Sequence, residues 1–136
     1  MEQWSVGSYP LSFMEESKKK LTHLDYLRKQ TKSDPGLMVD LISIYLDQTA
    51  GLITAMKNGL EGPRWQQLKA AAHKIIPSFR ILGIDDEYAD IPRKIEVLSA
   101  NQQSLNEITG LVAELEQICS RIFSELKDEV DALNRS

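Results

Sequence analysis

The chain has 136 residues, of which 42% are hydrophobic and 26% are charged. These values are typical of one globular domain that buries a core without disulfides or metal ions, and they argue against a disordered chain. The formal net charge of −4 argues against a nucleic-acid-binding protein, which needs a basic surface. The one cysteine, Cys119, excludes an internal disulfide and fits a reducing compartment.

No segment of the sequence is expected to enter a membrane or to act as a secretory signal. Charged residues such as Asp40 and Asp47 interrupt the apolar runs, whereas a membrane-spanning helix needs about 20 predominantly apolar residues. At the N-terminus, no basic stretch leads into an apolar one, as it would in a signal peptide. The sequence therefore predicts a cytoplasmic protein without membrane insertion.

The N-terminal part of the chain is interpreted as a tail over residues 1–11, followed by one domain over residues 12–136. Capping-box patterns begin at Ser12 and at Thr22. In such a pattern a Ser or Thr side chain bonds a backbone N–H at the start of a helix. The two patterns predict one or two short N-terminal helices.

Proline, glycine and aspartate indicate the ends of the next two helices. Asp34 followed by Pro35 predicts a helix start, because Asp is a good N-cap and the first helical position needs no N–H. This helix is expected to run to about Gly59. Pro63 is expected to start the following helix, and Gly83 to end it.

Two further helices are expected in the C-terminal half. The aspartates at 85–86 can cap the first of them, in which Pro92 predicts a kink or a restart near Asp90. A third capping box begins at Ser104 and predicts a long helix that continues to the C-terminus.

The spacing of apolar residues predicts how these helices pack. In each of the four long segments the apolar residues recur at steps of three and four, which places them on one face of a helix. No stretch alternates with the period of two that a half-buried strand requires. The sequence therefore predicts an all-α fold, an antiparallel up-down-up-down four-helix bundle. The short N-terminal helices would cover the overhanging end of the longer pair.

Most signatures of catalytic and cofactor sites are absent from the sequence. It contains no phosphate-binding loop, no dinucleotide motif, no zinc-protease motif and no Glu-x-x-His of a di-iron bundle. Cys119 falls in an apolar helical pattern and is interpreted as a core residue. His23 lies near a predicted helix start without a cation within a turn and is interpreted as an exposed side chain. We therefore expect no metal and no cofactor.

His73 is the histidine whose surroundings favour chemistry. On a helical wheel it lies about 110° from the centre of the apolar stripe, on a flank of the helix that faces water. The residues on or beside this flank are short, polar or cationic: Gln66, Lys69, Ala70, Lys74, Pro77 and Arg80. Short neighbours let a partner approach the imidazole, and cations suit transient bonding to a phosphoryl group. The alternative is an ordinary surface histidine on a basic strip.

The sequence around His73 also resembles a known family. Residues 71–83, A-A-H-K-I-I-P-S-F-R-I-L-G, are similar to the signature of histidine-containing phosphotransfer (HPt) domains, approximately A-H-x-L-K-G-x-x-x-x-[LIV]-G. The positions that match in place are Ala72, His73, Ile75, Leu82 and Gly83. The predicted helix from Asp34 and the approach W-Q-Q-L-K-A-A-A-H resemble the family as well, so the similarity extends over residues 21–130.

The resemblance implies a phosphocarrier of two-component signalling. His73 would accept a phosphoryl group from the aspartate of one response-regulator receiver domain, within a relay that begins at a hybrid sensor histidine kinase, and pass it to another receiver. The receiver would supply Mg²⁺ and most of the catalytic groups, so the chain would be a carrier and not an enzyme. Nothing on the outer faces of the predicted helices demands self-association, so a monomer is expected. A neutral imidazole offers the nucleophilic nitrogen that this transfer needs.

The resemblance also implies a docking face around the histidine. Glu96 is expected on the helix that faces His73, where relatives often carry a Gln that orients the imidazole. Gln66, Ala70 and Pro77 are expected to contact the receiver together with Glu96.

Two positions depart from the family pattern. Ile76 stands where relatives have a Lys that helps to hold the phosphoryl group, and it falls within the apolar stripe. The positive charge would then come from Lys69, Lys74 or Arg80. Pro77 stands where relatives have a Gly; it lacks an N–H and is expected to bend the helix. These departures leave open an alternative function, a non-phosphorylated helical adaptor that docks a receiver or kinase domain.

Overall fold

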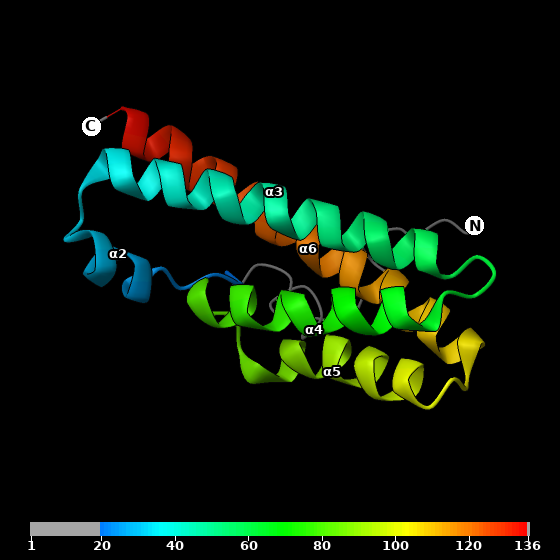
Figure 1. Ribbon diagram of the computed structural model, residues 1–136. Helices are drawn as coiled ribbons and strands as arrows, with labels where there is room; N and C mark the ends of the chain where they lie inside the picture. Colours follow the sequence, from blue (N-terminus) through cyan, green and yellow to red (C-terminus); the bar gives the residue numbers. More distant parts are fainter. Residues whose placement is uncertain (1–19, 136) are drawn as a thin grey trace, which may run out of the picture.

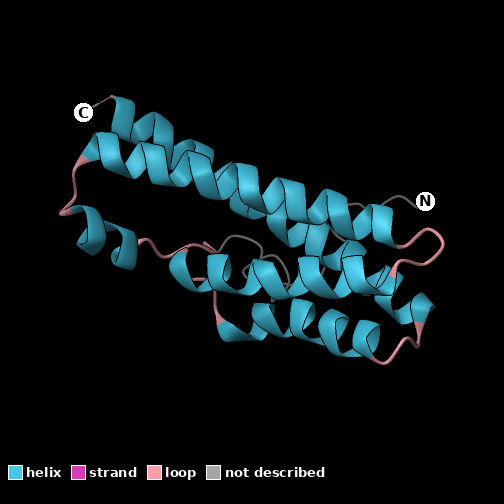
Figure 2. Cartoon of the chain, viewed as in Figure 1, coloured by secondary structure: helices cyan, strands magenta, loops and turns pink. Residues whose placement is uncertain are grey.

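The computed structural model describes residues 20–135, and each regular element in that range is a helix (Figures 1 and 2). The prediction of an all-α fold is confirmed for this part of the chain. The predicted tail and the predicted helix start at Ser12 lie outside the described residues. The helices are α2 (Asp25–Thr31), α3 (Pro35–Gly59), α4 (Trp65–Ile81), α5 (Asp86–Ala100) and α6 (Leu105–Asn134).

The four long helices pack around a common core. Helices α3 and α5 each contact both α4 and α6, and Figure 1 shows α4 lying between α3 and α5. The largest fully buried side chains come from all the described helices and the segment after α4: Leu27, Met38, Ile42, Met56, Leu68, Ile75, Phe79, Leu82, Ile95, Ile108, Leu115 and Ile122. Most of the apolar residues in the predicted stripes are thus buried or packed against the core, although Leu41, Tyr45 and Leu52 of α3 are only partly buried.

Helix α2 covers the end of the molecule where α3 and α6 extend beyond the other two long helices (Figure 1), as expected for a short N-terminal helix. Leu21, Leu24 and Leu27 are buried there. The carboxylate of Glu125 on α6 accepts hydrogen bonds of 2.8–3.0 Å from the backbone N–H groups of Leu21 and Thr22. These bonds attach the segment before α2 to α6.

The capping box predicted at Thr22 is wrong. Helix α2 begins at Asp25, and its N-cap residue Leu24 makes no side-chain capping bond. The hydroxyl of Thr22 instead donates a 2.8 Å hydrogen bond to Glu125. The Thr22 side chain therefore bonds to a residue of another helix instead of capping α2 as the local pattern predicted.

The predicted ends of α3 and α4 at Asp34 and Gly83 are confirmed. The side chain of Asp34 accepts a hydrogen bond from the Leu37 N–H, and Pro35 is the first helical residue. Gly83 follows the end of α4 with a φ of +71°, a left-handed conformation that favours glycine. A Cβ at this position would clash with the carbonyl oxygen of His23. Glycine thus allows the segment before α2 to cross the end of α4.

The helix start predicted at Pro63 is wrong, whereas at Ser104 the predicted helix start is confirmed and only the predicted capping bond is missing. Pro63 lies before α4, because the chain is still turning there: the N–H of Arg64 bonds back to the carbonyl of Gly59 at 2.8 Å. Ser104 does precede α6, but its φ of 61° is left-handed and its side chain makes no capping bond. A capping Ser normally needs an extended backbone to reach the helix N–H groups.

The restart predicted near Asp90 does not occur. Helix α5 is continuous from Asp86 to Ala100 and contains Pro92. Pro92 and its neighbours Ile91 and Ile95 are buried. Tertiary packing contributes more to helix stability than local propensity does, and the burial of this turn accounts for the unbroken helix.

One helix, α3, is more apolar than was expected of any segment in this chain. By length and composition alone, Pro35–Gly59 is sufficient to cross a membrane. In this structure α3 packs against α4 and α6, and Met38, Ile42 and Met56 belong to the core. A core helix meets the same criteria of length and composition as a membrane-spanning one.

Candidate functional site

The side chain of His73 projects from the outer face of α4. It is 70% exposed, although the adjacent Ala72 and the nearby Ile75 are fully buried. This contrast follows from the helical period, which turns successive residues by about 100°. The predicted position of His73 on a solvent-facing flank of the apolar stripe is confirmed.

A carboxylate from the neighbouring helix lies within hydrogen-bonding distance of one nitrogen of the His73 imidazole. The Nδ1 atom lies 2.9 Å from Oε2 of Glu96 on α5, and the side chain of Glu96 is 26% exposed. An ionised carboxylate can only accept hydrogen bonds, so the imidazole donates its Nδ1–H. The lone pair of a neutral imidazole is then on Nε2. Glu96 faces His73 as expected, although no pattern within its own helix indicates this contact.

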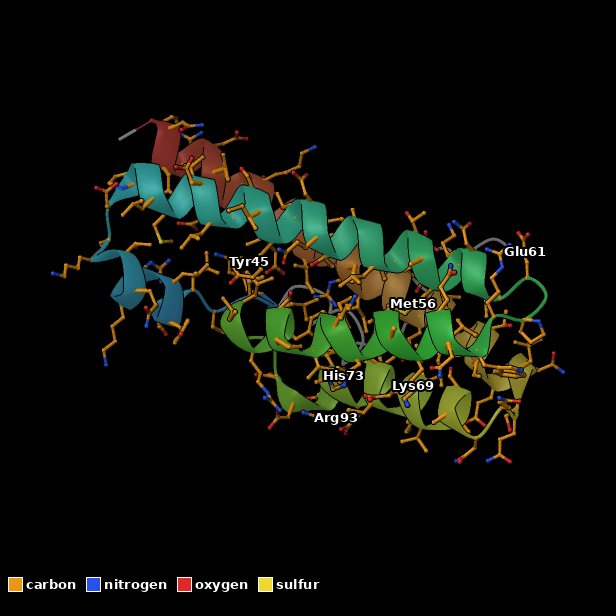
Figure 3. All side chains as sticks on the ribbon, in the orientation of Figure 1. Tyr45, Met56, Glu61, Lys69, His73 and Arg93 are labelled. Carbon is orange, nitrogen blue, oxygen red and sulfur yellow. The ribbon has the colours of Figure 1, made fainter. Side chains whose placement is uncertain are left out.

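His73 lies in a hollow of about 280 Å³ at the surface between α4 and α5. Figure 3 shows His73 and Lys69 on the side of α4 that faces α5. The residues that line the hollow are Gln66, Lys69, Ala70, His73, Lys74 and Glu96. Lys69 and Lys74 thus line the hollow together with the imidazole, while the short side chain of Ala70 leaves space beside it. The hollow can accept a small anionic group close to Nε2.

The other two residues predicted beside His73 lie in a different place. Pro77 and Arg80 line a second hollow together with Tyr26 and Ile81. Arg80 is seven residues beyond His73, which corresponds to about 10 Å along a helix. The structure therefore groups Lys69 and Lys74 with the imidazole and places Arg80 nearer the end of α4.

Tyr26 is a surface residue that the sequence reasoning missed. It belongs to α2 and is 52% exposed, and it lines one hollow together with Pro77 and Arg80 of α4. No local pattern links two helices so far apart in the sequence. The burial of Leu24 and Leu27 gives a signal in retrospect, because it directs the face of α2 that carries Tyr26 outward.

The positions that depart from the HPt pattern occupy contrasting environments. Ile76 is only 8% exposed, so its side chain belongs to the core as predicted. Pro77 is exposed, and α4 remains one helix from Trp65 to Ile81 around it. Helix α4 is therefore not interrupted at Pro77, and the bend there stays a prediction.

The two other candidates for chemistry, Cys119 and His23, have the surroundings that the sequence predicts. Cys119 is buried, and burial, with a contribution from Glu116, raises the pKa of its thiol to about 12. The thiol is therefore protonated at neutral pH and is a poor nucleophile. His23 is exposed, as expected. Among residues 20–135, no group of three or more His, Cys, Asp or Glu side chains is arranged to hold a metal ion.

Comparisons of the chain with protein-family models, with curated proteins and with solved structures found no match. We therefore infer the function from the residues of the site. These are an exposed imidazole, a carboxylate on its Nδ1 and two lysines that line the same hollow.

Proposed function

We propose that this chain is a phosphorelay protein in which His73 accepts a phosphoryl group from a receiver-domain aspartate and passes it to another receiver. The observation that carries the proposal is the environment of the imidazole. His73 is 70% exposed, its Nδ1 is held by Glu96, and Lys69 and Lys74 line the same hollow. The resemblance of residues 71–83 to the HPt signature adds the class of partner.

The geometry suits in-line transfer to Nε2. The Nε2 lone pair attacks the phosphorus of an aspartyl phosphate, and the N–P bond forms as the O–P bond breaks. The bonding electrons of the broken bond stay on the aspartate oxygen of the receiver. Such transfer depends on positioning and on neutralisation of charge. In this proposal the long, flexible side chains of Lys69 and Lys74, which line the same hollow, supply positive charge to the phosphoryl oxygens. Mg²⁺ and the other catalytic groups belong to the receiver in this proposal.

The proposed fold is an antiparallel up-down-up-down four-helix bundle. Its support is that α3, α4, α5 and α6 each contact two of the others and that short segments connect consecutive helices. In such a bundle α4 carries His73 near its middle, away from both ends. A flat partner surface can then approach the imidazole without meeting a loop.

The proposed docking surface follows α4 on both sides of His73. Toward the start of α4 it includes Gln66 and Ala70, and toward its end it includes the hollow lined by Tyr26, Pro77 and Arg80. Partners of the proposed relay are receiver domains and a hybrid sensor histidine kinase. The relay is proposed to operate in the cytoplasm, with this chain as a monomer that needs no cofactor.

One observation favours a second candidate function, a non-phosphorylated adaptor that docks a receiver or kinase through the same surface. Ile76 is buried at the position where HPt domains carry a phosphoryl-binding Lys. Pro77 follows it where the family has a Gly. An adaptor would keep the docking surface without transferring a phosphoryl group.

The two functions give different results in one assay. The full chain is mixed with a panel of receiver domains that have been phosphorylated with acetyl phosphate. A phosphocarrier acquires phosphate that is labile in acid and stable in base, as a phosphohistidine is. An adaptor forms a complex with a receiver and acquires no phosphate, which would contradict the proposed function.

A further inference from the structure

A second hollow, away from His73, lies between α3 and α6. These two helices pack against each other, as α4 and α5 do, so the groove between α3 and α6 shares no helix with the groove that holds His73. The hollow measures about 480 Å³, against about 280 Å³ around His73. A ligand between α3 and α6 therefore need not touch either helix of the candidate phosphotransfer site.

The floor of this hollow is apolar and its rim is acidic. The residues that line it are Ser43 and Leu46 of α3 and Ser124, Lys127, Asp128, Val130 and Asp131 of α6. Leu46 and Val130 are partly buried and pack against the core, so they form the floor. Asp128 and Asp131 are exposed and direct negative charge toward whatever enters the hollow.

Helix α3 contributes further carboxylates on the other side of the floor. Asp40 and Asp47 are exposed and lie three and four residues from Ser43. This spacing places them on the same side of the helix as Ser43, which lines the hollow. The apolar floor thus lies between carboxylates of α3 and carboxylates of α6.

The four carboxylates are not balanced by neighbouring cations. Among residues 20–135, none of them forms an ion pair with Lys, Arg or His, although Lys127 lines the same hollow. On α5, by contrast, Arg93 lies within 4 Å of both Asp86 and Asp90. Helix α6 as a whole contains seven acidic and two basic residues. The groove therefore carries an excess of negative charge that is available to a partner.

A basic amphipathic helix has the chemistry that complements this groove. Its apolar stripe would leave water by packing on the floor of the hollow. Lys or Arg side chains on both flanks of that stripe would meet the carboxylates of α3 on one side and of α6 on the other. An acidic segment of the same shape would be repelled by both rows.

We infer that the groove between α3 and α6 is a docking surface for a basic amphipathic helix of a partner protein. This inference goes beyond the proposed phosphotransfer at His73 and does not depend on it. A partner bound in this groove would hold the chain while a receiver approaches His73 from α4 and α5.

The first test uses the full chain and a synthetic helical probe. The probe is a peptide of about 18 residues, or about five helical turns, with leucines along one face and lysines on both flanks. One control peptide has glutamates in place of the lysines, and a second has serines in place of the leucines. Calorimetry is expected to show saturable binding of the probe that weakens as salt is added. The glutamate peptide is expected not to bind, and the serine peptide to bind more weakly.

The second test locates the bound probe on the chain. In NMR spectra of the full chain, the backbone amide signals of residues 43–46 and 124–131 are expected to shift as the probe is added. The signal of His73 is expected to stay in place, and His73→Gln is expected to bind the probe as the parent does.

The third test removes charge from the rim. Asp128→Asn combined with Asp131→Asn is expected to weaken probe binding about tenfold, because two of the four carboxylates become neutral. The matched control combines Glu107→Gln with Glu114→Gln, which removes the same charge from exposed positions in the first half of α6. Because exposed charges at that distance are screened, the control is expected to change the affinity by less than about twofold.

Three results would overturn the inference: no saturable binding, signal changes confined to another surface, or equal losses of affinity in the two double variants. Self-association of the chain that is removed by Asp128→Asn with Asp131→Asn would overturn it too, because the groove would then bind a second copy. A chain that binds the probe as expected but takes no phosphate from any receiver keeps this docking surface and loses the proposed function. Phosphate uptake without probe binding gives the opposite result.

Discussion

At the scale of single residues, the two ring nitrogens of His73 have different surroundings. Nδ1 contacts a carboxylate from α5, while most of the side chain is open to solvent. Lys69 and Lys74 are the cations that line the same hollow. In the proposed function these two lysines would balance the phosphoryl charge, because Ile76 is buried at the position where the HPt signature that the sequence resembles has a Lys.

The contribution of the two lysines can be measured separately. Lys69→Ala or Lys74→Ala is expected to slow transfer from a phosphorylated receiver about tenfold, which corresponds to about 1.4 kcal/mol of transition-state stabilisation. The measurement is the single-turnover rate of phosphate transfer. Lys127→Ala, on α6 beside a different hollow, serves as the control for loss of one surface charge. A double variant of Lys69 and Lys74 that transfers at the parent rate would show that they are only solvated surface charges.

At the scale of secondary-structure elements, two features concern α4, the helix that carries the site. They are the packing of the segment before α2 against the end of α4, and the proline within α4. The segment before α2 bonds to Leu82 through the N–H of His23 and passes close to Gly83. Pro77 lies one turn after His73 within α4. Both features concern the second half of α4, which extends from the candidate site to the end of the helix.

Substitution of Gly83 tests the crossing of α4 by the N-terminal segment. Gly83→Ala is expected to lower the free energy of unfolding by more than about 1 kcal/mol, because φ is +71° and left-handed backbone is costly for Ala. The new Cβ would also clash with the His23 carbonyl oxygen. Urea unfolding followed by circular dichroism measures the change.

Gly51→Ala is the matched control. Gly51 lies inside α3, and a Cβ there meets nothing within 4 Å. This variant is expected to gain about 0.5–1 kcal/mol, because Ala is the better residue in a helix interior. Equal effects of the two substitutions would contradict the assigned role of Gly83.

Pro77 provides the test of strain within α4. Proline in a helix interior costs about 3 kcal/mol when nothing relieves it, and here it removes the donor for the carbonyl of His73. Pro77→Ala is therefore expected to raise the melting temperature, with phosphotransfer unchanged or slower. A less stable variant would show that the proline suits its place in α4 and that the assumed cost is wrong.

At the scale of the whole molecule, the parts that the sequence could predict are those encoded by local periodicity. Apolar residues spaced three and four apart predict the four long helices and also the burial of Ile76. The same period predicted the exposure of His73. The bond between Thr22 and Glu125 joins residues 103 apart, so the local capping pattern at Thr22 was misleading. The hollow that Tyr26 shares with residues of α4 was unpredictable for the same reason.

Signals at helix ends were less informative than periodicity. Asp34 caps α3 as expected because its partner lies three residues away. Ser104 does not cap α6, since its backbone is left-handed, and backbone conformation in a turn depends on how the two flanking helices pack. The resemblance to HPt domains pointed to Glu96 as the residue facing the imidazole. Only the structure shows the 2.9 Å contact with Nδ1.

The central claim, that His73 carries a phosphoryl group, is tested most directly by transfer from a phosphorylated receiver to the parent, His73→Gln and His23→Gln. His23 is the other histidine of the chain and is exposed, so it controls for chemistry at any surface imidazole. The account predicts acid-labile, base-stable phosphate on the parent and on His23→Gln, and none on His73→Gln. The melting temperatures of all three should be nearly equal, because exposed side chains contribute little packing. Phosphate uptake by a folded His73→Gln variant, or no uptake by the parent from any receiver, would contradict it.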